Sequence, residues 1–189
     1  MKNNVLKTGL FLALVVVLSS FTSMTKKDVN ISESTINWTG HKVTGQHEGT
    51  IQLQEGQLHF DGKTLVGGNF VMDMTTINTT DLEGEWKGKL DGHLKSDDFF
   101  GVANHKTATL KFTKVTGKGS NYKVDADLTI KGITNPISFN LEVLDGTAVT
   151  KLKIDRTKYN IKYGSASFFD GLKDKAISNE FDLKVSLKF

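Results

Sequence analysis

Apolar and polar residues alternate without a break in two long stretches of the chain, residues 122–130 and 181–189. Side chains on a β-strand point to opposite faces in turn, so strict alternation indicates a strand with one apolar and one polar face. Nine residues is long for a strand. Several long amphipathic strands in one chain favour a closed antiparallel barrel, because closure removes the exposed sheet edges.

The same period of two recurs through most of the chain. Turn-forming residues separate the alternating stretches, among them Glu55-Gly56, Asp61-Gly62 and Asp145-Gly146. The pattern predicts an all-β fold of about eight strands, joined mostly by short hairpins. The alternating stretches are centred on residues 36–38, 51–53, 58–60, 70–74, 108–112, 122–130, 137–143, 152–154 and 181–189.

The period changes between residues 80 and 98, where a helical insertion is expected. Thr80 or Asp81 fits the N-cap position of this helix. The helix would either plug one end of the barrel or form a mobile lid over a ligand entrance. A second insertion, residues 163–178, is expected to be a long loop or a short helix. Four large apolar residues form the predicted helical stripe at intervals of four: Leu82, Trp86, Leu90 and Leu94.

Residues 1–23 have the layout of a secretory signal peptide. Lys2 and Lys7 precede an uninterrupted apolar run at residues 10–18, and small residues follow. This run is too short to span a bilayer of roughly 30 Å as a helix. We therefore expect cleavage within residues 20–24, a mature domain of residues 24–189 and a periplasmic or secreted location. An uncleaved membrane anchor is the alternative.

Charge and composition argue against several functions. The formal net charge of +3 falls to about +1 without the two leader lysines, which predicts no nucleic-acid partner. The chain has no cysteine, and its five histidines show no metal-ligand spacing. Neither a nucleophile elbow nor a phosphate-binding glycine loop is present. We expect no catalytic residue, no metal site and no cofactor, and therefore no enzyme.

The aromatic residues bear on what fills the barrel. Twelve phenylalanines, against three tyrosines and two tryptophans, supply apolar bulk without polar groups. An eight-stranded barrel is just wide enough for side chains or one small ligand, so these residues either fill a core or line a pore. A transmembrane barrel also alternates, but it carries girdles of Tyr and Trp that are scarce here. We expect a protein that is not integral to the membrane, with homodimer formation left open.

Six short motifs follow one another over nearly the whole mature chain: residues 38–42, 45–49, 71–74, 93–100, 126–134 and 154–156. Together they resemble the YceI-like family of periplasmic lipid-binding proteins. The resemblance implies an elongated, lipocalin-like, eight-stranded barrel with helical insertions and an isoprenoid chain in its apolar pore. Ala126 departs from the usual glycine, and residues 104–106 replace a frequent Tyr-Pro pair.

The hypothesis is therefore a barrel that binds, and transports or stores, an amphiphilic isoprenoid lipid of the polyprenyl or isoprenoid quinone type. A structural or interaction module with a filled core is the alternative. Phe99, Phe100, Phe168 and Phe169 are expected at the entrance. His47 is expected to form a hydrogen bond in the mouth or a purely structural contact. The expected tail contacts are Trp38, Ile51, Leu53, Phe60, Phe70, Met72, Phe112, Leu128, Ile130 and Phe139.

Overall fold

The computed structural model describes residues 24–189; the predicted leader, residues 1–23, lies outside the described part. The described chain is mostly β-strand, with an α-helix and two short 3-10 helices. In chain order the elements are β1 (Met24–Asp28), β2 (Asn30–Lys42), β3 (Gly45–Asp61), β4 (Thr64–Thr79), α1 (Gly84–Lys95), β5 (Thr107–Lys118), β6 (Asn121–Ile130), β7 (Ile133–Leu144), β8 (Thr147–Asp155), η1 (Arg156–Tyr159), η2 (Lys173–Lys175) and β9 (Ile177–Lys188).

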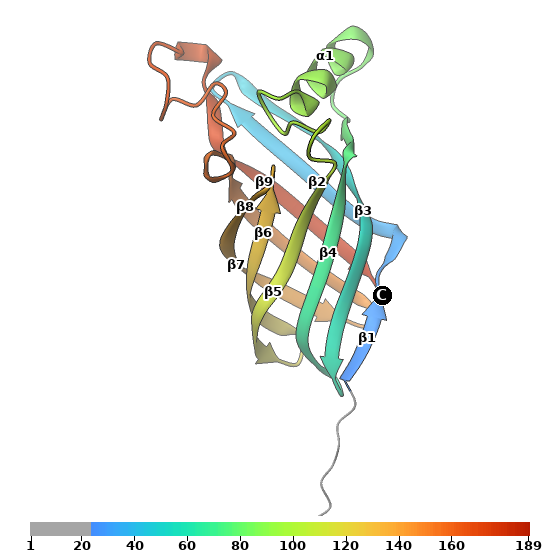
Figure 1. Ribbon diagram of the computed structural model, residues 1–189. Coiled ribbons are helices and arrows are strands. Elements are labelled where there is room, and N and C mark those ends of the chain that lie inside the picture. The colour runs from blue at the N-terminus through green and yellow to red at the C-terminus, as the bar shows by residue number, and fades with distance from the viewer. Residues whose placement is uncertain (1–23) are drawn as a thin grey trace, which may run out of the picture.

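The strands β2 to β9 form a closed antiparallel barrel (Figure 1). Each strand pairs with the next one along the chain, and β9 pairs back to β2, which closes the sheet. The predicted eight-stranded barrel is thus confirmed. The short strand β1 was not predicted; it pairs with the last part of β3, with Met24 opposite Asp61 and Asp28 opposite Gln57.

The two ends of the barrel differ. Figure 1 shows α1 and the loop that precedes β9 at one end, which we call the upper end, and the β3–β4 and β5–β6 hairpins at the other, which we call the lower end. Both insertions predicted from the sequence therefore lie at the upper end.

The alternating pattern places its apolar face inside the barrel. The apolar side chains of β6 are all buried, whereas the residues between them are not. The period of two in the sequence is thus converted into an apolar interior and a polar outer surface. The buried β6 residues are Tyr122, Val124, Ala126, Leu128 and Ile130.

The helix α1 is shorter than predicted and begins at Gly84. Its N-cap is Glu83, so the prediction of Thr80 or Asp81 is wrong. The Asp81 carboxylate instead accepts a hydrogen bond from the Glu48 backbone N–H, at 3.2 Å, which ties this segment to β3. The φ of +55° at Gly84 then turns the chain into the helix.

The predicted apolar stripe of α1 packs only in part. Leu94 is buried, Leu90 is partly buried, and Trp86 is 70% exposed. Polar contacts hold the helix instead: the Lys87 ammonium donates to Asp91, at 2.7 Å, and to the Thr79 carbonyl, at 2.8 Å. A helix over the open end of a barrel has little apolar surface to cover, which explains why its stripe is incomplete.

Candidate functional site

Two clusters of buried apolar side chains occupy the barrel, one toward each end. The lower cluster consists of Val29, Ile36, Leu53, Leu58, Phe60, Leu65, Phe70, Tyr122, Val124, Ala126, Phe139, Leu141, Ala148 and Leu187. The upper cluster consists of Met74, Ile77, Leu94, Phe99, Val102, Ala108, Leu128, Ile130, Ile154, Tyr159 and Ile161.

Six apolar side chains pack against both clusters and are only partly buried. We call them the central belt. They come from six different strands, β3, β4, β5, β7, β8 and β9, and so surround the barrel interior. An inward side chain that remains accessible must face empty space, because the interior is otherwise close-packed. The central belt consists of Ile51, Met72, Leu110, Ile137, Leu152 and Leu183.

This space is a cavity of about 180 Å³, and every residue of the central belt lines it. An apolar cavity of about 150 Å³ is sufficient to bind benzene in another protein. Aromatic rings form much of the remaining wall, with Phe112 between Phe70, at a centroid distance of 5.5 Å, and Phe139, at 5.9 Å. The wall of the cavity is therefore apolar and rich in aromatic rings, as in sites that bind apolar ligands.

The structure brings most of the predicted site residues together around this cavity. Tail and entrance residues both occur among them. Those that line it are Trp38, Ile51, Leu53, Phe70, Met72, Phe99, Phe100, Phe112, Leu128, Ile130 and Phe139.

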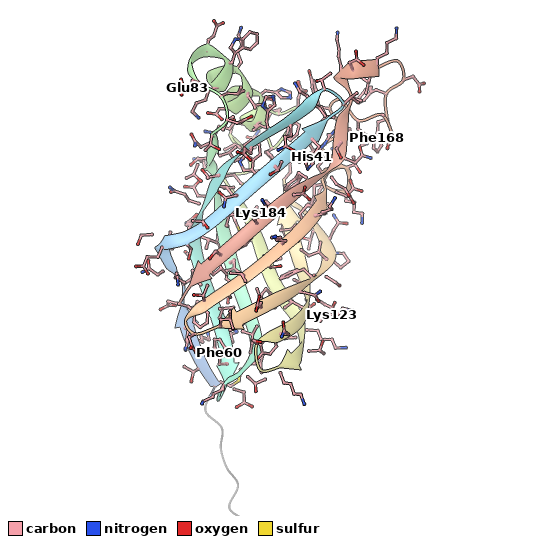
Figure 2. All side chains as sticks on the ribbon, turned by 180° about the vertical axis from the view of Figure 1, so that it is seen from behind. His41, Phe60, Glu83, Lys123, Phe168 and Lys184 are labelled. Carbon is pink, nitrogen blue, oxygen red and sulfur yellow. The ribbon has the colours of Figure 1, made fainter. Side chains whose placement is uncertain are left out.

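Four predicted site residues lie away from the cavity wall. Phe60 points inward as expected, but it belongs to the lower cluster and packs on Phe189 with a centroid distance of 5.6 Å. Figure 2 shows Phe60 at the lower end and Phe168 at the upper end. Phe168 and Phe169 are 47% and 50% exposed in the loop before β9. His47 lies 2.9 Å from the Asp81 carboxylate, outside the cavity.

Several cavity residues were not singled out from the sequence. They include Phe181 and four members of the central belt, and their signal was available, because each has the inward parity of its strand. Arg156 was also missed, although it is the only arginine beside 23 lysines and directly follows β8. The belt residues in question are Leu110, Ile137, Leu152 and Leu183.

The Lys131 side chain holds two of the predicted entrance residues in place. Lys131 and Gly132 have φ values of +52° and +75° and form the tight turn between β6 and β7. From this turn the Lys131 ammonium donates to the carbonyl oxygens of Asp97, at 2.6 Å, and Phe99, at 3.0 Å. The turn thereby fixes the segment that contains Phe99 and Phe100.

Close backbone packing positions Trp38 on the cavity wall. The Trp38 indole N–H donates to the Thr50 carbonyl, at 3.2 Å, and the ring lies against Gly49. A Cβ atom at Gly49 would overlap both the ring and the Asn78 carbonyl oxygen. Glycine at this position thus allows the indole to lie flat against β3.

Polar side chains meet the cavity mainly at the upper end. His41 and Glu180 line it there, together with Ser178 and Arg156. His41 Nε2 lies 2.7 Å from the Asp182 carboxylate, and Figure 2 shows His41 in the upper half of β2. The exposed wall of the cavity is nevertheless almost entirely apolar, and the polar residues that adjoin it gather at its upper end.

Two carboxyl groups near α1 have lowered pKa values. Burial acts to raise the pKa of Asp91, but hydrogen bonds from the Lys87 side chain and from Thr79 outweigh it and lower the pKa below its ordinary value. The pKa of Asp81 is lowered in the same way, because hydrogen bonds from His47 and the Glu48 backbone outweigh the effect of burial. Both carboxylates are therefore ionised at neutral pH and fasten the upper end.

Two buried polar groups adjoin the upper cluster. Burial raises the pKa of Tyr159 to about 12, with a further contribution from the Asp155 charge, and the Tyr159 hydroxyl has no hydrogen-bond partner among the described residues. Burial lowers the pKa of Arg156, and the Asp155 carboxylate opposes this shift. Arg156 nevertheless stays charged at neutral pH, as arginines in proteins do.

Residues 24–189 contain no group of three or more His, Asp or Glu side chains arranged to hold a metal ion. Within the same residues, no helix has the length and apolar character needed to cross a membrane.

Comparisons with known proteins agree with this geometry. A UPF0312 protein of Vibrio parahaemolyticus is 31% identical over 147 residues, which cover 75% of this chain and 74% of that protein. The crystal structure of BcnA from Burkholderia cenocepacia superposes with a TM-score of 0.70 at 20% identity and covers 85% of this chain and 98% of that one.

A polyisoprenoid binding domain from Saccharophagus degradans has the same fold, with a TM-score of 0.57 at 16% identity over 87% of this chain and 97% of that one. The family model of the YceI-like domain matches residues 28–189, which is the whole barrel. The chain therefore belongs to the YceI-like family.

Proposed function

We propose that this protein binds an amphiphilic isoprenoid lipid, of the polyprenyl or isoprenoid quinone type, and acts as its carrier or store rather than as an enzyme. The observation that carries the proposal is the central belt, a ring of inward apolar side chains that stay partly exposed inside the barrel. The likeness to a polyisoprenoid binding domain supports the isoprenoid class.

Burial of the tail supplies the affinity. Each buried CH₂ contributes about 0.8 kcal/mol, so ten buried carbons would contribute on the order of 8 kcal/mol before the cost of ordering the chain is subtracted. A cavity of about 180 Å³ suits a short tail or the end section of a long one. We therefore propose that the affinity rises with tail length for the first isoprene units and then levels off.

The direct test is extraction of the native ligand. The protein is purified without detergent, extracted with organic solvent and analysed by mass spectrometry. We expect an isoprenoid in near-stoichiometric amount. If the extract is empty and the protein also fails to bind added farnesol in titrations, the lipid-binding function is refuted.

A cavity-filling variant tests where the tail lies. Leu183→Trp places an indole in the central belt, whereas Leu144→Trp places the same bulk at a turn position that is 55% exposed. We expect Leu183→Trp to lose at least about tenfold in farnesol affinity, because the indole occupies the tail site. Leu144→Trp is the matched control and should bind as the native protein does. Equal affinity of both variants would place the ligand outside the cavity.

The filled-core alternative predicts a different result. A structural or interaction module would bind no lipid, and Leu183→Trp would overpack a complete core and destabilise the fold by about 1–3 kcal/mol. Thermal unfolding of the variant thus separates the two functions. We further propose a periplasmic or secreted location, on the basis of the leader pattern in residues 1–23.

A further inference from the structure

Arg156 is a buried cation on the wall of an otherwise apolar cavity. It is the first residue of η1, directly after β8, and its side chain lies at the upper end. Only 2% of the residue is exposed. Burial of a full charge is costly unless hydrogen bonds and an opposite charge compensate it. The contacts of the guanidinium group show how far the protein supplies each of them.

All recorded hydrogen bonds from this guanidinium go to backbone carbonyl oxygens. Nε donates to Ser178 at 2.9 Å, Nη1 to Ile161 at 2.8 Å, and Nη2 to Ile177 at 3.1 Å. A guanidinium has five N–H groups, so one on each terminal nitrogen is left without a protein acceptor. Two N–H groups on the terminal nitrogens of one guanidinium can donate to two oxygens of one anion.

No carboxylate of the protein neutralises this charge by contact. None of the six ion pairs in residues 24–189 includes Arg156. The Asp155 carboxylate is engaged elsewhere, since it accepts from the Thr157 backbone N–H at 2.9 Å and from the Thr157 hydroxyl at 2.6 Å. The carbonyl oxygens supply dipoles, and the Asp155 charge favours the charged guanidinium without forming an ion pair with it.

The acidic residues nearest the upper end of the cavity already have partners of their own. Asp182 lies 2.7 Å from His41 and 3.8 Å from the Lys153 ammonium, which is also 4.0 Å from Glu180. The face of the guanidinium is covered by the Phe99 ring, at 5.5 Å from the centroid. Among residues 24–189, Arg156 is the only lysine or arginine on the cavity wall.

We propose that Arg156 binds the oxyanion of an anionic head group, a phosphate or a carboxylate, on an amphiphile whose tail lies against the central belt. This proposal rests on the lipid-binding function proposed above and adds the chemistry of the head group. An oxyanion would accept hydrogen bonds from the two free N–H groups and supply a countercharge in direct contact with the guanidinium, in a site of low polarity. A neutral head group would supply neither the charge nor the paired oxygens.

The test compares ligands that share one tail. Farnesyl monophosphate and farnesol differ only in the head group, and palmitate and hexadecanol form the matching pair for a carboxylate. In the native protein we expect at least one anion to bind about tenfold more tightly than its alcohol, because hydrogen bonds to charged groups are strong. The pair with the larger ratio of anion affinity to alcohol affinity shows whether the site prefers a phosphate or a carboxylate.

Variants of Arg156 then assign the preference to this residue. Arg156→Gln should abolish the anion preference, measured as the ratio of anion affinity to alcohol affinity within the variant, whereas Arg156→Lys should retain part of the preference. Circular dichroism establishes that each variant is folded. If Arg156→Gln does not fold, the ligand comparison in the native protein still decides the matter.

The possible results separate the two proposals. Equal binding of each anion and its alcohol by the native protein would overturn the head-group assignment and leave the lipid-binding function standing. An anion preference that survives in folded Arg156→Gln would also overturn it. If none of the four ligands binds, the lipid-binding function itself fails.

Discussion

The lower and upper ends of the barrel are built from the same strands but are closed by different forces. At the lower end, apolar side chains pack closely: Leu58 and Val124 have no exposed surface, and the Phe60 ring packs against that of Phe189. At the upper end, polar side chains tie separate segments together, as Lys131 does for the segment around Phe99 and Arg156 for the start of β9.

This difference divides the tasks of stability and access between the two ends. Close packing is cooperative and costly to disturb, so the lower end should supply most of the stability. Single polar contacts contribute less and can be exchanged with water or ligand groups. An end held in this way can open toward a cavity without unfolding the barrel, and this contrast is open to measurement.

The largest effect is expected from truncation in the lower cluster. Leu58→Ala should lower the free energy of unfolding by about 3 kcal/mol, because it leaves a new cavity in a packed core. Leu152→Ala makes the same change in the central belt, beside a cavity that already exists, and should cost roughly 1 kcal/mol. Urea denaturation gives both values, and equal losses would mean that the belt is as tightly packed as the lower cluster.

A second contrast lies within the upper half of the barrel. Gly49→Ala should cost about 2 kcal/mol, because the new methyl group overlaps the Trp38 ring and the Asn78 carbonyl. Gly40→Ala is the control, since a Cβ atom there has no neighbour within 4 Å, and it should change stability by less than about 0.5 kcal/mol. Thermal unfolding would contradict this prediction if both variants melted alike.

Two buried tyrosines test the polar contacts of the two ends. At the lower end the Tyr122 hydroxyl accepts the Leu65 backbone N–H at 3.3 Å. Tyr122→Phe should therefore cost about 1–2 kcal/mol, because it leaves that donor unpaired. The Tyr159 hydroxyl at the upper end has no hydrogen-bond partner within residues 24–189, so Tyr159→Phe should stay within about 0.5 kcal/mol of the native protein or be more stable. The reverse order in denaturant titrations would show that Tyr159 has a bound water or another acceptor.

The smallest effect concerns the ionised carboxyl groups that fasten α1. The folded-state pKa of Asp91 lies below its ordinary value of 3.8. Its contribution is therefore present above the unfolded-state pKa and is lost as the pH falls through the folded-state pKa. We expect a contribution of less than about 1 kcal/mol, because the ion pair with Lys87 is partly exposed.

Asp91→Asn separates this effect from general acid unfolding. The variant should be less stable at pH 7 and should lose less stability than the native protein between pH 5 and pH 3 (roughly the range in which carboxyl groups titrate). Hydrogen exchange of α1 provides a local readout. An unchanged pH dependence in the variant would show that Asp91 does not fasten the helix.

Much of the cavity wall could be predicted from the sequence, and the exceptions share a cause. Strand parity correctly pointed Phe60 inward, but parity does not give the height of a residue along the barrel axis. That height depends on strand tilt and register, and these placed Phe60 in the lower cluster rather than at the cavity. Leu152 and Leu183 show the opposite case, because they line the cavity but were not predicted as site residues. Their inward parity was visible in the sequence, whereas their height along the barrel axis is visible only in the closed barrel.

The helix illustrates the same limit at its start. The spacing from Leu82 to Leu94 correctly predicted a helix, but the predicted N-cap was wrong. The Asp81 carboxylate accepts a hydrogen bond from the backbone N–H of Glu48 on β3, 33 residues earlier in the chain. A side chain that could cap a nearby helix can instead form its hydrogen bond with a distant strand. Sequence spacing contains no information about such a competitor.

The sequence by itself determined that the chain forms long amphipathic strands with one apolar face. With a period of two, the strand is the regular structure that places all the apolar side chains on one face. It also determined where that pattern stops, at the two insertions. Only the tertiary structure decided that the barrel is packed below and hollow in the middle, since this depends on how six strands bring their side chains to one height. The burial of Arg156 without an ion-pair partner was decided in the same way, by segments that lie apart in the chain and meet at the upper end.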